Sequence, residues 1–193
     1  MNLTAFKPEV IVNEVFALYE KHGNDTYAEK PVSHLEHMLQ AATLAEDEGF
    51  EDEVVLAAFF HDIGHLCASS EDVTSMGGFG NEDHERLGAD YLRERGFSER
   101  LAALVESHIV AKRYLTYKDP EYYDQLSEAS KATLELQGGR MNEEEAANFE
   151  LNPDAALFIR LRYWDDKAKD ANKQIYDMSH FKLLAISHLY KNN

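Results

Sequence analysis

The chain contains little cysteine and little basic charge, and each shortage excludes a class of protein. A single cysteine, Cys67, in 193 residues excludes an internal disulfide framework and is typical of a reducing compartment. The 19 Lys and Arg residues against 36 Asp and Glu give a net charge of −17, which repels nucleic-acid backbones and anionic lipids. No apolar run is long enough to span a bilayer, and residues 1–7 lack a signal-peptide pattern. We expect a cytoplasmic protein that binds neither nucleic acid nor membrane.

The chain also lacks the strict apolar–polar alternation of β-strands, and its apolar residues recur at helical spacing instead. Ser33 and Glu36 have the spacing of a capping box, and Asp119-Pro120 is a typical helix start. The expected helices cover residues 7–22, 33–49, 52–65, 82–95, 98–114, 120–126, 127–137, 142–149, 153–166 and 178–190. We predict an all-α single domain over residues 1–193. Its core spans about residues 27–169, with the N- and C-terminal helices packed on it.

The most informative stretch is the apolar run 54–60, which leads directly into His61-Asp62. Two adjacent ionisable residues at the end of an apolar segment are costly to bury unless something compensates them, and a metal ion commonly does so. Asp62 has two carboxylate oxygens and could bridge two metals. A helix end whose polar residues simply face water is the alternative explanation.

Other candidate metal ligands lie on different expected helices, several of them beside apolar stripes. Taken together, the candidates are His37, His61, Asp62, His84, His108 and Asp165. A single histidine in such a position is more often a hydrogen-bonded core residue. Six candidates on mostly separate helices favour a shared site, because inward histidines and carboxylates on converging helices form the di-iron centres of helical proteins.

The order of these residues resembles the HD-domain superfamily. His37, then His61-Asp62, then the late Asp165 follow its H…HD…D pattern, and His84 and His108 match the additional histidines of its dinuclear members. Several segments also resemble the HD-domain oxygenases that cleave carbon–phosphorus bonds. These segments are residues 35–37, 61–65, 76–80, 88–92, 96–100, 111–115 and 136–139, and the similarity runs from about residue 27 to residue 169.

The resemblance implies an HD-domain helical bundle around a central dinuclear site that holds two iron ions, Fe(II) and Fe(III), with O2 as cosubstrate. One iron would bind His37, His61, Asp62 and Asp165, and the other His84, His108 and the shared Asp62. The implied substrate is a small phosphonate of the 1-hydroxy-2-aminoethylphosphonate type, which is converted to a carboxylate and phosphate. No obligate protein partner is expected.

The resemblance also implies which residues bind the substrate. His65, Lys112, Ser130 and Arg162 occupy the family's phosphonate-binding positions, and His65 and Lys112 have catalytic roles there. Tyr27 matches a catalytic tyrosine that covers the iron until the substrate arrives. Without the resemblance, each of these side chains would pass for an ordinary surface residue.

The sequence departs from the family where the substrate ammonium would bind. The family's glutamate position is Lys30 here, and a lysine would repel an ammonium. Glu29, one residue earlier, would have to swing in to bind the substrate. Aromatic faces bind quaternary ammonium groups, and aromatic residues flank the expected ligands. They are Phe59, Phe60, Phe79, Tyr163 and Trp164. We therefore expect (R)-1-hydroxy-2-(trimethylammonio)ethylphosphonate as substrate and glycine betaine as product, although the same aromatics could be core packing.

Three alternative functions remain open. An HD-domain phosphohydrolase would use a metal-bound hydroxide on a phosphate ester. A ring-cleaving di-iron oxygenase of the inositol type has similar ligands, but it has no need of the cations at Lys112 and Arg162 or of Ser130. A non-catalytic metal-binding module is the last alternative.

Overall fold

The protein is described by a computed structural model, which covers residues 7–25, 32–67 and 83–192. All regular elements within these residues are helices, so the predicted all-α fold is confirmed. The helices are α1 (Pro8–His22), α2 (His34–Asp47), α3 (Asp52–Phe60), α4 (Gly64–Cys67), α5 (His84–Arg93), α6 (Glu99–Lys118), α7 (Pro120–Gln125), α8 (Glu128–Leu136), α9 (Glu143–Glu150), α10 (Ala155–Lys167) and α11 (Met178–Asn192).

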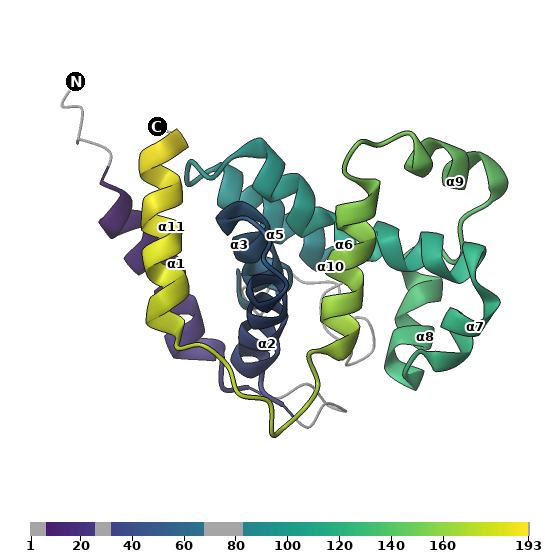
Figure 1. The fold of residues 1–193 in the computed structure, drawn as a ribbon, viewed down its shortest axis with the longest axis horizontal. Coiled ribbons are helices and arrows are strands. Elements are labelled where there is room, and N and C mark those ends of the chain that lie inside the picture. Colours follow the sequence, from purple (N-terminus) through teal and green to yellow (C-terminus); the bar gives the residue numbers. More distant parts are fainter. Residues whose placement is uncertain (1–6, 26–31, 68–82, 193) are drawn as a thin grey trace.

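The helices surround a central group formed by α2, α3, α6 and α10 (Figure 1). Helix α6 packs against α5 on one side and α10 on the other, and α2 packs against both α3 and α10. Helices α1 and α11 pair with each other at one end of the molecule, where α11 contacts α3. Helices α7, α8 and α9 lie at the opposite end, beyond α10. Within the described residues, no helix combines the length and apolarity that a membrane crossing needs.

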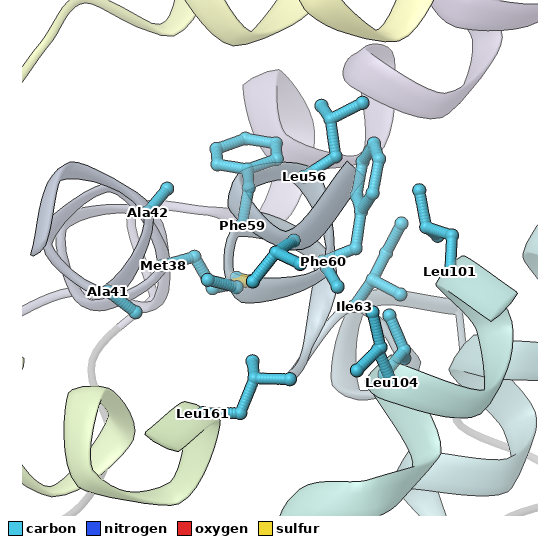
Figure 2. Packing of buried hydrophobic residues seen from close by; sticks show 14 of the residues in the cluster. Met38, Ala41, Ala42, Leu56, Phe59, Phe60, Ile63, Leu101, Leu104 and Leu161 are labelled. Carbon is cyan, nitrogen blue, oxygen red and sulfur yellow. The ribbon is translucent and has the colours of Figure 1, made fainter. Parts of the chain in front are cut away.

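The core is built on α3, whose seven residues 54–60 are all buried. Phe59 and Phe60 lie at its centre beside Met38 of α2 and Leu101 of α6 (Figure 2). The Phe59 ring stacks on Phe16 at a centroid distance of 5.4 Å and on Phe181 at 5.2 Å. Burying an aromatic side chain of this size contributes about 2–3 kcal/mol. A helix that is apolar all round has to be enclosed by other helices, so α3 fixes the centre of the bundle.

Local capping defines where the central helices begin. The expected capping box is present: the Ser33 backbone N–H donates to Glu36 Oε2 at 2.7 Å, and the Glu36 N–H donates to Ser33 Oγ at 3.2 Å. The Ser98 hydroxyl accepts from the Leu101 N–H at 3.1 Å at the start of α6. Each such cap is worth about 1 kcal/mol and sets the register of the residues that follow.

The segment 52–65 is not one continuous helix, and this prediction is wrong. Helix α3 ends at Phe60, residues 61–63 form a turn, and α4 begins at Gly64. Bonds of the i to i−3 type tighten this turn, with the Ile63 N–H donating to the Phe60 carbonyl at 2.9 Å and the His65 N–H to the Asp62 carbonyl at 3.1 Å. Such bonds turn the chain by about 120° per residue rather than about 100°, and His61 and Asp62 are both buried at this turn. Helical periodicity cannot register a change of this size over three residues.

Glycine at position 64 allows α4 and α5 to touch. A Cβ added to Gly64 would overlap the backbone carbonyl of His84, and a Cβ on Gly88 would approach the Gly64 nitrogen to 3.0 Å. The obstacle at Gly64 is main chain, which cannot rotate away. The close approach therefore brings the turn at residues 61–63 beside the first turn of α5.

We expect Gly64→Ala to destabilise the protein by at least about 3 kcal/mol, because overpacking against backbone forces α4 and α5 apart. Gly49→Ala is the comparison, since a Cβ at that left-handed glycine, φ 79°, meets no atom within 4 Å. It should cost only about 1–2 kcal/mol for the backbone conformation. Thermal and denaturant unfolding measure both costs, and equal losses in the two variants would contradict the proposed contact.

Candidate metal centre

The six predicted metal ligands come together at the centre of the bundle, and all six are buried. The ligand atoms form two groups: one from His37, His61 and Asp62, the other from Asp62, His84 and His108. Within each group these atoms lie within 4.8 Å of one another. Asp165 joins the first group, since its Oδ1 lies 3.2 Å from His37 Nε2.

Asp62 stands between the two groups and turns one oxygen toward each. Its Oδ2 lies 3.5 Å from Nε2 of both His37 and His61. Its Oδ1 lies 3.4 Å from His84 Nε2 and 3.6 Å from His108 Nε2. This is the arrangement of a carboxylate that bridges two metal ions.

The histidine rings face one another through nitrogens that carry no proton in the neutral tautomer. His37 Nδ1 lies 2.7 Å from the Ala168 carbonyl, His61 Nδ1 2.8 Å from the Ala58 carbonyl, and His108 Nδ1 3.0 Å from the Val105 carbonyl. A carbonyl can only accept, so each Nδ1 carries the hydrogen and each Nε2 presents a lone pair.

The Nε2 atoms nevertheless approach closely, at 3.2 Å between His37 and His61 and 2.9 Å between His84 and His108. Between His37 and His61 two lone pairs repel each other at this distance, and a cation that both nitrogens bind removes the repulsion. Burial lowers the pKa of His108 to about 3, so this imidazole stays neutral at physiological pH, as a metal ligand must be. The donor set therefore fits a dinuclear site.

The end of α10 is tied over α2, which fixes Asp165. His37 donates to the Ala168 carbonyl, and Gln40 binds Asp170 in both directions, with Nε2 to its carbonyl at 3.0 Å and Oε1 from its N–H at 3.1 Å. Burial alone would raise the pKa of Asp165. The Arg162 guanidinium holds that pKa well below its ordinary value, so the carboxylate is ionised.

Two buried cations lie one helical turn from metal-centre residues. Lys112 follows His108 by four residues on α6, and Arg162 precedes Asp165 by three residues on α10. Residues at these spacings share a helix face. Both side chains are at least 95% buried, with exposed fractions of 2% for Lys112 and 4% for Arg162.

Lys112 is held by neutral acceptors. Its ammonium donates to Thr133 Oγ1 at 3.1 Å and makes a short hydrogen bond to Gln137 Oε1. Burial, followed by the nearby Arg162 charge, lowers its pKa to about 7. The positive charge of Arg162 thus disfavours the protonated form of Lys112. A doubly charged anion bound between the two side chains would offset this repulsion.

Each guanidinium nitrogen of Arg162 donates to a protein group, which leaves one further N–H on each Nη. Its Nη1 donates to Asp165 Oδ2 at 2.7 Å, its Nη2 to Asp166 Oδ1 at 2.6 Å and its Nε to the Tyr122 hydroxyl at 2.8 Å. An anion bound here would share the guanidinium with Asp165, and Arg162 thus links the cationic side of the site to the metal centre.

The other two predicted phosphonate-binding residues are half-buried. The His65 ring stacks on the His84 ring with centroids 4.0 Å apart. Ser130 lies in the first turn of α8, one turn before Thr133, whose Oγ1 donates to the Ser130 carbonyl at 3.3 Å. Tyr27, Glu29, Lys30 and Phe79 lie outside the described residues.

The aromatic residues proposed to hold a quaternary ammonium do not line the site as a group. Phe59 and Phe60 pack in the core described above. Trp164 is buried against Phe50, with ring centroids 4.9 Å apart, and its Nε1 donates to Glu48 Oε2 at 3.1 Å. Tyr163, which is half-buried, meets Tyr122 edge-on at 6.2 Å. Core packing therefore explains Phe59, Phe60 and Trp164.

Six side chains that support this site were not predicted from the sequence. They are Gln40, Glu85, Tyr122, Thr133, Gln137 and Asp166. Gln137 belongs to the segment 136–139 that carried the family resemblance, and Asp166 adjoins Asp165, so both had a signal in the sequence. Except for Glu85, the others contact residues that lie more than 20 positions away in the sequence, and residue spacing alone does not reveal such contacts.

The two groups predict different metal stoichiometries for two variants. We expect Asp62→Asn to lose tight binding at both positions, because both need the shared carboxylate. Asp165→Asn should keep the metal held by His84 and His108 and lose most of the other. Metal analysis of the purified variants measures both, and full occupancy in Asp62→Asn would contradict a bridging Asp62.

Comparison with known proteins agrees with this geometry. The family described as HD domain matches residues 33–147. The chain is 42% identical over 178 residues to an uncharacterized protein of Acanthamoeba polyphaga mimivirus, an alignment that covers 92% of this chain and 81% of that protein. It is 41% identical to the [1-hydroxy-2-(trimethylamino)ethyl]phosphonate dioxygenase (glycine-betaine-forming) of Leisingera caerulea, in an alignment that covers 89% of this chain and 86% of that protein. It is 38% identical to the hydroxymethylphosphonate dioxygenase of Gimesia maris, in an alignment that covers 88% of this chain and 84% of that protein. The chain therefore belongs to the HD-domain family and, within it, to the phosphonate dioxygenases.

Proposed function

We propose that this protein is a di-iron oxygenase that uses O2 to cleave the carbon–phosphorus bond of a 1-hydroxyphosphonate. The proposed substrate is (R)-1-hydroxy-2-(trimethylammonio)ethylphosphonate, and the products are glycine betaine and phosphate. In this reaction the hydroxyphosphonate dianion and O2 give a carboxylate, hydrogen phosphate and one proton, which balances atoms and charge. The observation that carries the proposal is a pair of ligand groups sharing Asp62 with two buried cations one turn away.

The donor set supports iron. His37, His61, Asp62 and Asp165 would hold one ion, and His84, His108 and Asp62 the other. Imidazole and carboxylate donors suit iron, and no thiolate, the donor typical of an iron–sulfur cluster, belongs to either group. Two iron ions of different valence supply the one-electron steps that O2 chemistry needs.

The protein's own residues would bind and orient the substrate. Lys112 acts as a point charge on the phosphonate, and Arg162 can offer two parallel N–H donors. The His65 ring and the Ser130 hydroxyl would complete the phosphonate site. Because Lys112 and Arg162 share helix faces with His108 and Asp165, a bound phosphonate would place its hydroxyl-bearing carbon beside the metal centre. The burial of the site excludes water, which strengthens these charge interactions.

A second substrate has independent support. Hydroxymethylphosphonate carries no ammonium group, so it needs no cation-binding residue. The lysine at position 30, where the family places a glutamate, and the core positions of Phe59, Phe60 and Trp164 favour it. The relative from Leisingera caerulea, whose name specifies the trimethylamino substrate, favours the first choice.

An oxygen-dependent assay tests the proposal. We expect the iron-loaded protein to release phosphate from the trimethylammonio substrate in air and none under argon, with O2 consumed in equal amount. Hydroxymethylphosphonate and 1-hydroxy-2-aminoethylphosphonate, assayed beside it, define the preferred substrate. The Asp62→Asn variant is the control.

Phosphate release from phosphate esters without O2, together with inactivity on all three phosphonates, would support the phosphohydrolase alternative instead. Activity on hydroxymethylphosphonate alone would replace the proposed substrate while leaving the reaction class in place.

The lowered pKa of Lys112 predicts that anion binding depends on pH. With its pKa near 7 in the ligand-free protein, the ammonium loses its proton as pH rises above 7, so an anion then binds only with proton uptake. Affinity for a saturated phosphonate should fall by up to about tenfold per pH unit relative to Lys112→Met, since each pKa unit is worth about 1.4 kcal/mol. Calorimetry between about pH 6.5 and 9 measures the affinity of both proteins for the phosphonate. Because the ligand's own titration affects both equally, it cancels in the comparison. Parallel curves would show that Lys112 does not contact the anion.

The same residue affects stability. Its folded pKa of about 7 lies below the ordinary 10.5, so the unfolded chain binds more protons between these values. In that window the free energy of unfolding of the ligand-free wild type should rise with pH relative to Lys112→Met.

A further inference from the structure

One of the four histidines at the centre has a different partner at its outer nitrogen. Nδ1 of His37, His61 and His108 each faces a backbone carbonyl, at 2.7, 2.8 and 3.0 Å. Nδ1 of His84 lies 3.5 Å from the carboxylate Oε2 of Glu85. A shift of about half an ångström would bring this pair to hydrogen-bond length. The two metal positions are therefore not equivalent in their surroundings.

Glu85 is positioned for this contact. Its side chain is only 18% exposed, and its Oε2 is buried with no hydrogen-bond partner among the described residues. A buried carboxylate oxygen without a donor is costly, and the His84 N–H is a donor within reach. Once His84 Nε2 binds a cation, its Nδ1–H becomes more acidic and a stronger donor, which draws the carboxylate closer.

We propose that Glu85 is a positioning residue for the second metal position, and this inference rests on the proposed dinuclear centre. Glu85 fixes the His84 tautomer with its Nε2 lone pair toward the metal and makes the imidazole a stronger ligand. Removing such an outer partner typically weakens metal binding about 10–100-fold. The carboxylate charge would also favour the higher oxidation state of a metal ion held by His84 and His108. Glu85 does not touch substrate or metal.

Glu85 also has a purely structural explanation. It lies in the first turn of α5, where an acidic side chain stabilises the helix dipole by about 0.3–1 kcal/mol. The test must therefore separate metal binding from helix stability. Glu106 supplies the matched control, because it lines the same surface cavity of about 420 Å³ as Glu85. Its carboxylate pairs with Arg93 at 3.1 Å rather than with a histidine of the centre.

The first experiment titrates metal-free wild type, Glu85→Gln and Glu106→Gln with Zn(II) against a chromophoric chelator. Zinc binding requires neither iron nor catalysis. We expect wild type and Glu106→Gln to bind two equivalents tightly. Glu85→Gln should bind the first as tightly and the second at least about tenfold more weakly, with a melting temperature like that of Glu106→Gln.

The second experiment measures the reduction potential of the iron-loaded proteins by spectroscopic titration. We expect a more positive potential for Glu85→Gln than for wild type, since a negative charge is lost near the oxidised ion, and no change for Glu106→Gln.

The outcomes separate this inference from the proposed function. Two tight equivalents and an unchanged potential in Glu85→Gln would overturn the inference and leave the dinuclear centre intact. Equal weakening of both equivalents together with a lower melting temperature would assign Glu85 a structural role only, and would also overturn it. A single equivalent in wild type would overturn the dinuclear centre itself.

Discussion

The structure depends on four imidazoles held close together around one carboxylate, against the repulsion between the unprotonated nitrogens of His37 and His61. Four rings meet at Nε2 contacts as short as 2.9 and 3.2 Å, with Asp62 between the pairs. Three of the rings give their only hydrogen to backbone carbonyls, so they cannot bond to one another. Burying such a cluster costs free energy unless cations occupy its centre. A metal ion bound there would stabilise the fold, and metal binding and folding would then be linked.

The rest of the fold holds these side chains against that repulsion. Phe59 and Phe60 anchor α3 in an aromatic core directly before the His61-Asp62 turn. Gly64 lets α5 come close enough to bring in His84. The bonds from His37 and Gln40 to residues 168–170 hold the end of α10 over α2. A rigid apolar support on one side and backbone locks on the other give the preorganised geometry that metal chemistry requires.

The cationic side of the site is built into the same helices. Lys112 and Arg162 follow the register of His108 and Asp165, so the anion site and the metal centre cannot be displaced independently. Arg162 even shares Asp165 with the metal position. Lys112 donates to Thr133 and Gln137, and its burial, followed by the Arg162 charge, lowers its pKa to about 7.

The sequence by itself determined the helices, their caps and the six side chains at the centre, because these follow from local periodicity, capping chemistry and a spaced motif. The Ser33–Glu36 box and the Asp119-Pro120 start are local signals of this kind. Only the tertiary structure decided that residues 61–63 form a turn, that Phe59, Phe60 and Trp164 serve the core, and that Glu85 faces His84 while Arg162 contacts Asp165. Those features depend on which helix faces meet and on backbone contacts such as that of Gly64 with His84. Such contacts join residues that are far apart in the chain, so the periodicity of the sequence does not reveal them.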